Sequence, residues 1–216
     1  MDEGTAFGGH RGRRPRRDAT RNREAIIAAA ERVFAERGID APLDEAAREA
    51  GVGPATLYRH FPSRLALLEG IYREAVQRYL DAAERALAVV DPWEALAGFV
   101  EDSVRITHAL PSPLLLASRL AADGADLAIS DALSEPIRLL VARAHAAGVL
   151  HPAVASTDLV LIPHLLRDLG EAEAWRRPLA LLLRGLRADD AAPLPADGAS
   201  LSVAAYTRLV HGGTRR

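Results

Sequence analysis

The feature that most constrains this chain is a pair of short helical stretches separated by a glycine turn. The first stretch runs from about Leu43 to Ala50 and stops at Gly51, a residue type that tolerates the left-handed conformation just past a helix end. Pro54 suits the first turn of the second stretch, where its missing N–H costs nothing. Because Pro62 disfavours helical geometry at Phe61, the second helix is only about two turns long. This spacing predicts a helix-turn-helix.

A helix this short depends on packing to stay folded, and Val52, Leu57 and Phe61 lie where they can supply it. The outer face then carries small residues at its N-terminal end, followed by hydroxyl, phenol and cationic groups. A face of this kind fits the major groove of DNA. Its residues are Pro54, Ala55, Thr56, Tyr58, Arg59 and His60.

Two runs of residues in the first third of the chain carry a resemblance to a known family. The first run is Ile26-Ile27-x-Ala29-Ala30-x-x-Val33-Phe34-Ala35-Glu36-x-Gly38. The second is Ala50-Gly51-Val52-Gly53-x-x-Thr56-Leu57-Tyr58-Arg59-His60-Phe61-Pro62-Ser63-Arg64-x-x-Leu67-Leu68. With these runs, the span from about Thr20 to Leu68 resembles the DNA-binding domain of the TetR family of repressors. The match is dense, and it covers about the first third of the chain.

The resemblance implies specific contacts with double-stranded DNA. It assigns phosphate contacts to Thr56, Tyr58 and His60, and to Arg64 at the start of the next helix. The residues placed to meet base edges or the adjacent backbone are Pro54, Ala55 and Arg59.

The chain departs from the family pattern at two positions. Pro42 stands where the family more often has a threonine or serine that caps the helix and contacts phosphate, so the resemblance does not carry this contact over. Ala46 replaces the usual isoleucine, which predicts looser packing beneath that helix.

Length and composition are consistent with one small DNA-binding unit and one larger helical unit, because 49% of the 216 residues are hydrophobic. The absence of cysteine excludes disulfides and thiolate metal sites. No apolar run approaches the about 18 residues of a membrane span, and the arginine-rich N-terminus lacks the apolar stretch of a secretion signal. We therefore expect a cytoplasmic protein that does not associate with membranes.

The net charge of −2 conceals a strongly basic N-terminus. Between residues 11 and 23 the chain carries seven arginines and one acid, Asp18. We expect residues 1–19 to form a flexible arm that orders along the phosphates or in a minor groove, with Arg16 and Arg17 among its DNA contacts. The alternative interpretation is a solvated tail that keeps the protein soluble.

Helix signals follow one another after the glycine turn, with no alternating stretch long enough to argue for a strand. The predicted helices run from Ser63 to a point before Pro92, from a cap at Asp91 to about Ala109, from Ser112 toward Asp123, and from Ser134 to Ala147. The fold class is therefore all-α. The predicted domains are a helix-turn-helix domain at 20–62, a helical ligand-binding and dimerisation domain at 63–187, and a loop with a short helix at 201–210 within 188–216.

Two late segments, Thr157–Leu169 and Trp175–Leu186, are apolar on more than one face. The family resemblance implies that two such helices from each subunit form a four-helix interface in a homodimer. Pro163 is expected to kink the first of them. The alternative is that both are ordinary core helices of a monomer. The predicted interface residues are Leu159, Ile162, Leu166, Leu169, Leu179, Leu182, Leu183 and Leu186.

The resemblance also implies a pocket for a small-molecule effector in the helical domain, with an aliphatic lining and a few polar groups. For each polar candidate alone, a histidine hydrogen-bonded in the core or an arginine ion-paired on the surface is the simpler interpretation. The candidate ligand-binding residues are Phe99, Arg105, His108, Leu116, Arg119, Leu120 and His164. The other histidines have no ligand-like spacing with acids, so neither a metal site nor a cofactor is predicted.

Enzyme functions find no support, since the chain has no phosphate-binding glycine loop, no strand-associated nucleophile and no catalytic residues that can be named. The leading hypothesis is a ligand-controlled repressor that leaves a palindromic operator when an effector tilts the long helix. One alternative is a DNA-binding regulator that is controlled by a protein partner or is not controlled at all. The other is a helical protein that has lost DNA binding.

Overall fold

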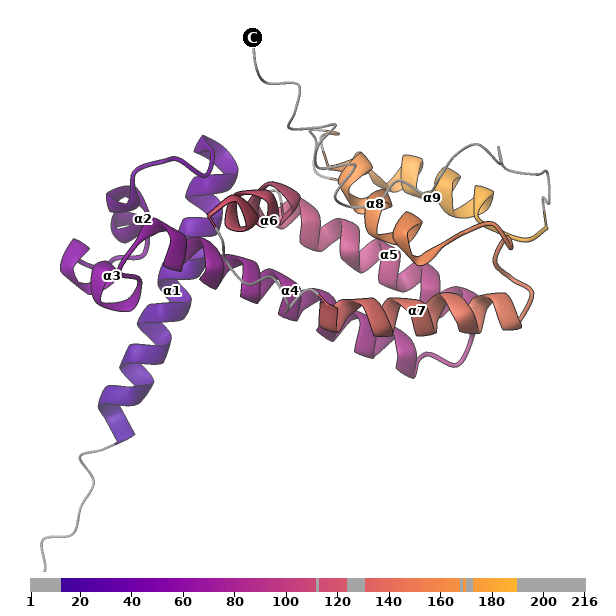
Figure 1. Ribbon diagram of the computed structural model, residues 1–216, viewed down its shortest axis with the longest axis horizontal. Helices are drawn as coiled ribbons and strands as arrows, with labels where there is room; N and C mark the ends of the chain where they lie inside the picture. The colour runs from indigo at the N-terminus through magenta and orange to yellow at the C-terminus, as the bar shows by residue number, and fades with distance from the viewer. Residues whose placement is uncertain (1–12, 112, 124–130, 168, 170–172, 190–216) are drawn as a thin grey trace, which may run out of the picture. The chain divides into compact units, whose positions relative to one another are not determined.

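The computed structural model describes residues 13–111, 113–123, 131–167, 169 and 173–189 (Figure 1). In these ranges the chain forms nine helices and a single isolated bridge between Leu150 and Arg187, which confirms the predicted all-α class. Most of the predicted C-terminal loop, and the short helix at 201–210, lie outside the described residues. The chain divides into two compact units, 1–67 and 68–216, and the boundary falls inside one long helix.

The first unit contains α1 (Arg13–Arg37), α2 (Leu43–Glu49), α3 (Pro54–His60) and the start of α4 (Arg64–Ala88). Gly38 and Gly51 follow α1 and α2 with φ angles of 86° and 67°, conformations that L side chains rarely adopt. Each helix contributes apolar side chains to the interior of the unit. The buried residues include Ile26, Ala29, Ala30, Phe34, Ala46, Ala47, Leu57, Phe61 and Leu67.

The predicted flexible arm at 1–19 overlaps a helix, because α1 already begins at Arg13. Pro15 lies in the first turn of α1, where a proline removes no intrahelical hydrogen bond, and the arginines around it have good helix propensity. Residues 13–19 are therefore helical, and the predicted boundary between arm and domain at residue 19 is wrong. The earlier part of the arm, 1–12, lies outside the described residues.

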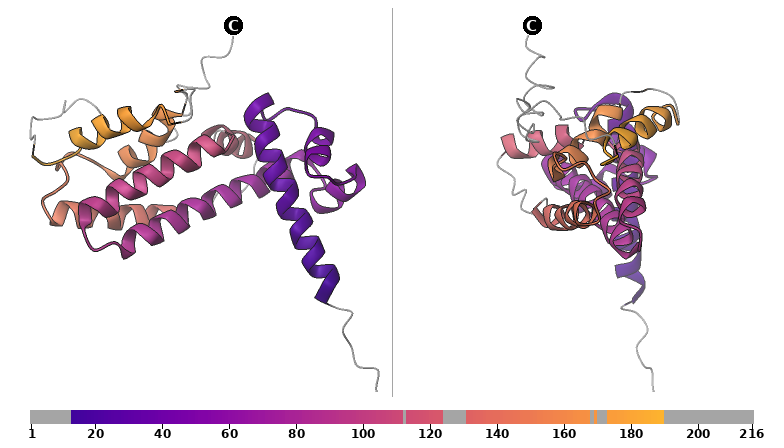
Figure 2. Two further views of the ribbon diagram at one scale, coloured as in Figure 1. Left: turned by 180° about the vertical axis from the view of Figure 1, so that it is seen from behind. Right: turned by 90° about the vertical axis from the view of Figure 1, so that its right-hand side faces the viewer.

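The second unit contains the rest of α4 and five further helices, which Figures 1 and 2 show from three directions. α5 packs against α7 and α8, which also contact each other. The five helices are α5 (Pro92–Ala109), α6 (Pro113–Ala122), α7 (Asp131–Ala146), α8 (Ser156–Leu166) and α9 (Arg176–Gly185).

The start of α5 follows a local signal, whereas the start of α7 and the end of α8 differ from those predicted. The Asp91 carboxylate accepts a 2.8 Å hydrogen bond from the backbone N–H of Glu94, as the predicted cap requires. α7 begins at Asp131, three residues before the predicted start, and Pro136 lies inside it. α8 ends at Leu166 rather than at Leu169, which lies beyond the helix.

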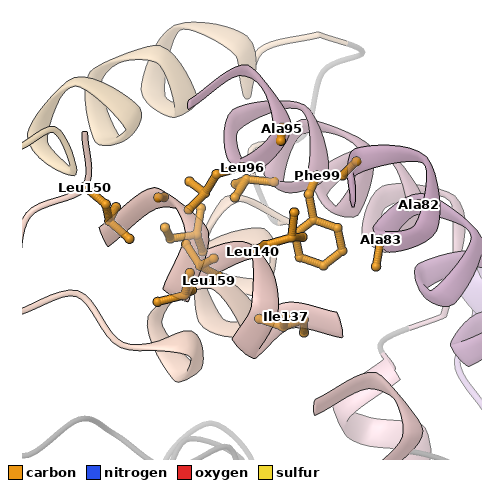
Figure 3. Close-up of a cluster of buried hydrophobic side chains, with 14 of the residues drawn as sticks. Ala82, Ala83, Ala95, Leu96, Phe99, Ile137, Leu140, Leu150 and Leu159 are labelled. Atoms are coloured by element: carbon orange, nitrogen blue, oxygen red, sulfur yellow. The ribbon is translucent and has the colours of Figure 1, made fainter. Parts of the chain in front are cut away.

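The core of the second unit is mostly aliphatic and joins the second half of α4 to α5, α7, α8 and α9 (Figure 3). Phe99 of α5 is its largest fully buried side chain. Around it Leu96, Ile137, Leu140 and Leu159 converge from three helices. None of the helices in the described ranges is both long and apolar enough to cross a membrane.

Candidate functional site

α3 is a seven-residue helix held by hydrogen bonds at both ends and by two buried side chains. The carbonyl of Gly53 accepts from the backbone N–H groups of Thr56 and Leu57 at 2.9 and 3.1 Å. At the other end Phe61 N donates to the carbonyl of Leu57 at 2.8 Å. Leu57 and Phe61 are each 1% exposed, so they anchor α3 on the interior of the first unit as predicted.

The opposite face of α3 is exposed. Pro54, Ala55, Tyr58 and Arg59 are exposed, and Tyr58 shows 48% of its surface to solvent although it is large and aromatic. Thr56 and His60 are half-buried. α3 contains no acidic residue, and among the described residues Arg59 has no hydrogen-bond or ion-pair partner. The face is therefore open to an external anion.

Contacts from α1 hold α2 and the end of α3 in place. The guanidinium of Arg23 lies 4.7 Å from the ring centroid of Phe61. Arg37 pairs with Glu45 of α2 at 2.7 Å, and Arg32 pairs with Glu49 at 3.1 Å. These ion pairs are largely solvent-exposed, so each contributes about 0–1 kcal/mol and serves mainly to orient the helices.

The N-terminus of α2 begins at a position where the sequence departs from the family pattern. Pro42 is the N-cap residue, and no side chain caps the helix there. A proline offers neither a backbone N–H nor a hydroxyl to a phosphate. The contact that a threonine or serine makes at this position is therefore not available from Pro42.

Arg64 has an internal role that the sequence did not reveal. Its Nη1 donates a 2.7 Å hydrogen bond to the carbonyl of Ile39 in the loop before α2, and its guanidinium lies 5.8 Å from the ring centroid of Phe34. The side chain is half-buried. Arg64 thus fastens the start of α4 to the loop between α1 and α2, and this contact does not support the predicted phosphate contact.

The positive charge of the first unit is concentrated at its N-terminal end. Residues 18–64 contain seven arginines and eight acids, whereas residues 11–17 contain five arginines and no acid. Arg16 and Arg17 lie in the first turns of α1, and their side chains lie outside the described residues. The net charge of residues 18–64 is therefore close to zero, and residues 11–17 supply the excess of positive charge.

The predicted ligand-binding residues divide into an interior and a surface group. Phe99, Leu116 and Leu120 are buried, with 2%, 0% and 1% exposure. His108 is half-buried, and its Nε2 lies 3.1 Å from the carbonyl oxygen of Leu166. His164 is also half-buried; burial, and then the charge of Arg167, lower its pKa from 6.5 to about 4.

Two predicted ligand-binding residues lie on the surface instead. Arg105 is exposed and pairs with Glu101 and Asp102. Arg119 is exposed and its Nε lies 3.2 Å from the carboxylate of Asp123. Each guanidinium has an acid three or four residues away on its own helix or just past the end of it, and that of Arg105 also lies 5.8 Å from the ring centroid of the buried Trp175. Their predicted part in ligand binding stays a prediction, and the structure places both residues at the surface.

The interior also holds polar side chains that sequence reasoning missed. Ser103 and Thr107 are buried on α5, with 2% and 0% exposure, and the Tyr79 hydroxyl lies 2.7 Å from Thr107 Oγ1. The available signal was the spacing of two hydroxyl residues four positions apart on an otherwise apolar face. Tyr79 was hidden because it continues the apolar stripe of α4.

The predicted dimer interface is partly wrong. Four of its residues belong to the core of this chain, since Leu159, Ile162, Leu166 and Leu179 are between 0% and 6% exposed. Leu183 and Leu186 pack against the same core and are half-buried. Only Leu169 and Leu182 are exposed, at 40% and 38%. The sequence missed two more exposed residues, Leu165 at 59% and Leu181 at 60%.

An all-helical chain with a short, exposed and acid-free second helix in a helix-turn-helix defines a DNA-binding transcription regulator. The sequence model of the family described as "Bacterial regulatory proteins, tetR family" matches residues 26–71. A solved structure of a TetR transcription regulatory protein from Mycobacterium vanbaalenii is 32% identical. It superposes with a TM-score of 0.60 over 80% of this chain and 99% of its own length. The chain belongs to the TetR family, whose members are transcription regulators and not enzymes.

Curated relatives match over part of the chain. The transcriptional repressor BepR of Brucella suis is 42% identical over 64 residues, which are 29% of this chain and 31% of BepR. The transcriptional activator FasR of Mycolicibacterium smegmatis is 40% identical over 83 residues, or 38% of this chain and 37% of FasR. The chain thus matches about a third of the length of these two proteins, one a repressor and the other an activator.

Proposed function

We propose that this protein is a homodimeric repressor that binds a palindromic operator through α3 and leaves it when a small-molecule effector binds the second unit. The observation that carries the DNA-binding part is the exposed face of α3. It presents a phenol and a guanidinium that has no partner in the described part of the chain, on a helix without an acid. A face of this composition is complementary to the negatively charged major groove.

The residues of α3 divide between positioning and reading. Thr56, Tyr58 and His60 would contact phosphates, which fix the register of the helix without reading sequence. Arg59 is long enough to reach a base edge, where a bidentate contact with guanine contributes about 1–3 kcal/mol of discrimination. The smaller residues at the start of α3 allow the close approach that these contacts need.

Dimerisation would supply the second recognition helix. One short helix makes too few contacts for the about 10⁻⁸ to 10⁻¹¹ M affinity that is typical of specific sites. Among the residues that the structure describes, four of the eight exposed large apolar side chains lie on α8, on α9 or within three residues of the end of α8. Residues of both helices belong to the core of the second unit or pack against it. The exposed leucines are Leu165, Leu169, Leu181 and Leu182.

Control by an effector would act through α4, a continuous helix that begins in the first unit at Arg64 and ends in the second at Ala88. A ligand that tilts α4 would change the separation of the two α3 helices from the roughly 34–36 Å between successive major grooves. A coupling free energy of about 1–3 kcal/mol would change operator affinity by about 5- to 150-fold.

The test is binding to DNA that flanks the gene, measured by gel shift and by fluorescence anisotropy. We expect Tyr58→Ala to weaken binding to specific and unrelated DNA alike, and Arg59→Ala to relax sequence preference as well. Arg73→Ala is the matched control, because Arg73 is an exposed arginine on α4 that has no partner among the described residues. Operator-specific loss with Tyr58→Ala would contradict its phosphate role.

The same assay separates the alternatives. Binding that no small molecule releases would favour a regulator controlled by a protein partner or by nothing. Absence of binding by the intact protein would show that the chain does not recognise DNA. A reporter gene placed behind the operator distinguishes repression from activation, since only a repressor raises expression when it is deleted.

A further inference from the structure

The first half of α1 extends beyond the packed part of the first unit. α1 begins at Arg13, but Ile26 is its first buried residue among those described. Between residues 18 and 25 every side chain is exposed except that of Asn22, which is half-buried. We call residues 13–25 the α1 extension. At 1.5 Å per residue it is about 20 Å long, and Figures 1 and 2 show it projecting past the other helices of the first unit.

The α1 extension is strongly basic. Residues 13–23 contain six arginines and one acid, Asp18. Arg14, Arg17 and Arg21 follow one another at three- and four-residue spacing, which places like charges on one face of a helix and destabilises it. Arg21 and Arg23 are exposed, and neither forms an ion pair with another described residue. A polyanion lying along the helix would relieve this repulsion.

The α1 extension begins beside the end of α3. The guanidinium of Arg23 lies 4.7 Å from the ring centroid of Phe61, which directly follows α3. From Arg23 back to Arg13 the helix advances about 15 Å. Since one strand of DNA has a phosphate about every 3.4 Å along the axis, this length matches about four phosphates.

The helical form of the extension decides which part of DNA it can reach. An α-helix with its side chains is about 10–12 Å across, whereas the minor groove of B-DNA is about 6 Å wide. The helix is therefore too wide for the minor groove, which a disordered arm could enter. The major groove, about 12 Å wide, admits one helix, and α3 is proposed above to occupy it. The phosphate backbone beside that groove is the part of DNA left for the extension.

We propose that the α1 extension is a rigid basic rod that lies along the phosphates flanking the major groove entered by α3. A preformed helix holds its arginines at fixed spacing, so binding does not have to overcome the entropy cost of ordering an arm. The inference rests on the proposed DNA binding, since it names how the N-terminal arginines take part in it. Of the two sites expected for the arm, the phosphates and a minor groove, it selects the phosphates.

The first experiment breaks the helix without removing an arginine. Ala19 is exposed inside α1, and a proline there removes a backbone hydrogen bond and clashes with the preceding turn. We expect Ala19→Pro to weaken binding of the full-length protein to its footprinted DNA site by about 10- to 100-fold, measured by fluorescence anisotropy. The slope of log K against log salt concentration should also become shallower.

Ala19→Gln is the matched control, because glutamine has good helix propensity and leaves the charge unchanged. Thermal unfolding of both variants should match that of the unmodified protein, since residue 19 lies outside the packed part of α1. A flexible arm would tolerate the proline. Equal affinity and equal salt dependence in the two variants would therefore overturn the inference.

The second experiment changes the DNA and uses the unmodified protein. Methylphosphonate linkages, which carry no charge, replace the phosphates that flank the major groove of the site. We expect them to weaken binding at least about tenfold, and to have a smaller effect on Ala19→Pro. A polyamide bound in the neighbouring minor groove should not compete with the protein. Competition by the polyamide, or unchanged affinity for the neutral linkages, would overturn the inference.

The outcomes separate this inference from the proposed function. If the intact protein binds its site, but neither the proline nor the neutral linkages change binding, DNA recognition by α3 stands and the rod is rejected. If the intact protein binds no DNA, both are rejected.

Discussion

Leu165→Asp should separate the subunits while leaving each of them folded. Leu165 is 59% exposed at the end of α8, whereas its neighbour Leu166 is 4% exposed and belongs to the core. A charge at Leu165 remains in water in the monomer and is desolvated only in the dimer. A charge at Leu166 would be buried in either state and would unfold the second unit.

The magnitude follows from the exposed fraction of Leu165. Full burial of a leucine side chain contributes about 1.5–3 kcal/mol, so covering the 59% that remains exposed contributes about 1–2 kcal/mol. A two-fold interface contains the substitution twice, which gives about 2–4 kcal/mol per dimer. The dimer dissociation constant should therefore rise by about 30- to 700-fold, before the desolvation of the carboxylate is added.

The assay is sedimentation velocity over a concentration series, combined with a gel shift on the same samples. Leu139→Asp is the control, because Leu139 is an exposed leucine on α7 at 42% and lies outside the proposed dimer face. We expect Leu165→Asp to sediment as a monomer with unchanged thermal stability and to lose the palindromic site. If both variants remained dimeric across the series, the assignment of the dimer face to α8 and α9 would be refuted.

Three further predictions follow from single groups of side chains. Replacing the five arginines between residues 11 and 17 with glutamine should make DNA binding less dependent on salt. The slope of log K against log salt concentration should change by about 0.9 for each phosphate that is no longer neutralised. An unchanged slope would show that this segment does not contact DNA in the complex. Arg64→Ala should lower the free energy of unfolding by about 1–3 kcal/mol in urea titrations, since it leaves the Ile39 carbonyl without its partner, while Arg59→Ala should not. Unfolded His164 binds a proton below pH 6.5 but the folded residue only near 4, so stability should fall by about 3 kcal/mol between these values as pH drops. His164→Gln should remove this part of the pH dependence of stability. If the variant lost as much stability as the unmodified protein between these pH values, His164 would not be the cause.

Sequence reasoning succeeded where the signal is local. The cap at Asp91, the glycine after α2 and the proline at the start of α3 each act within one helical turn, and all three stand where the sequence predicts them. The buried anchors of α3 also follow from local spacing, because a two-turn helix has room for only one inward face. These features define the candidate DNA-binding face without knowledge of the rest of the chain.

Sequence reasoning failed where several faces of a helix are apolar. α8 is apolar on almost every side, so periodicity cannot decide whether Leu165 or Leu166 points inward. That choice depends on where α5 and α7 lie, which no local pattern encodes. The surface position of Arg105, by contrast, could have been predicted from the sequence, since Glu101 lies four residues earlier on the same helix. The internal hydrogen bond of Arg64 could not be predicted from the sequence, because its partner Ile39 is 25 residues away.

Affinity and sequence preference should reside in different segments of the first unit. Residues 18–64 are nearly balanced in charge, so the salt-dependent attraction to phosphates has to come mainly from the five arginines of residues 11–17. α3 contributes one arginine and a phenol on a rigid, anchored helix, which suits it to reading a site rather than to attracting DNA. Substitutions before residue 18 should therefore change affinity for all DNA in proportion, whereas Arg59→Ala should change the ratio between the operator and unrelated DNA. Affinities for the operator and for unrelated DNA, measured in one salt series for both sets of variants, would assign each contribution to its segment. If replacing the arginines before residue 18 changed the preference for the operator, affinity and sequence preference would not reside in separate segments.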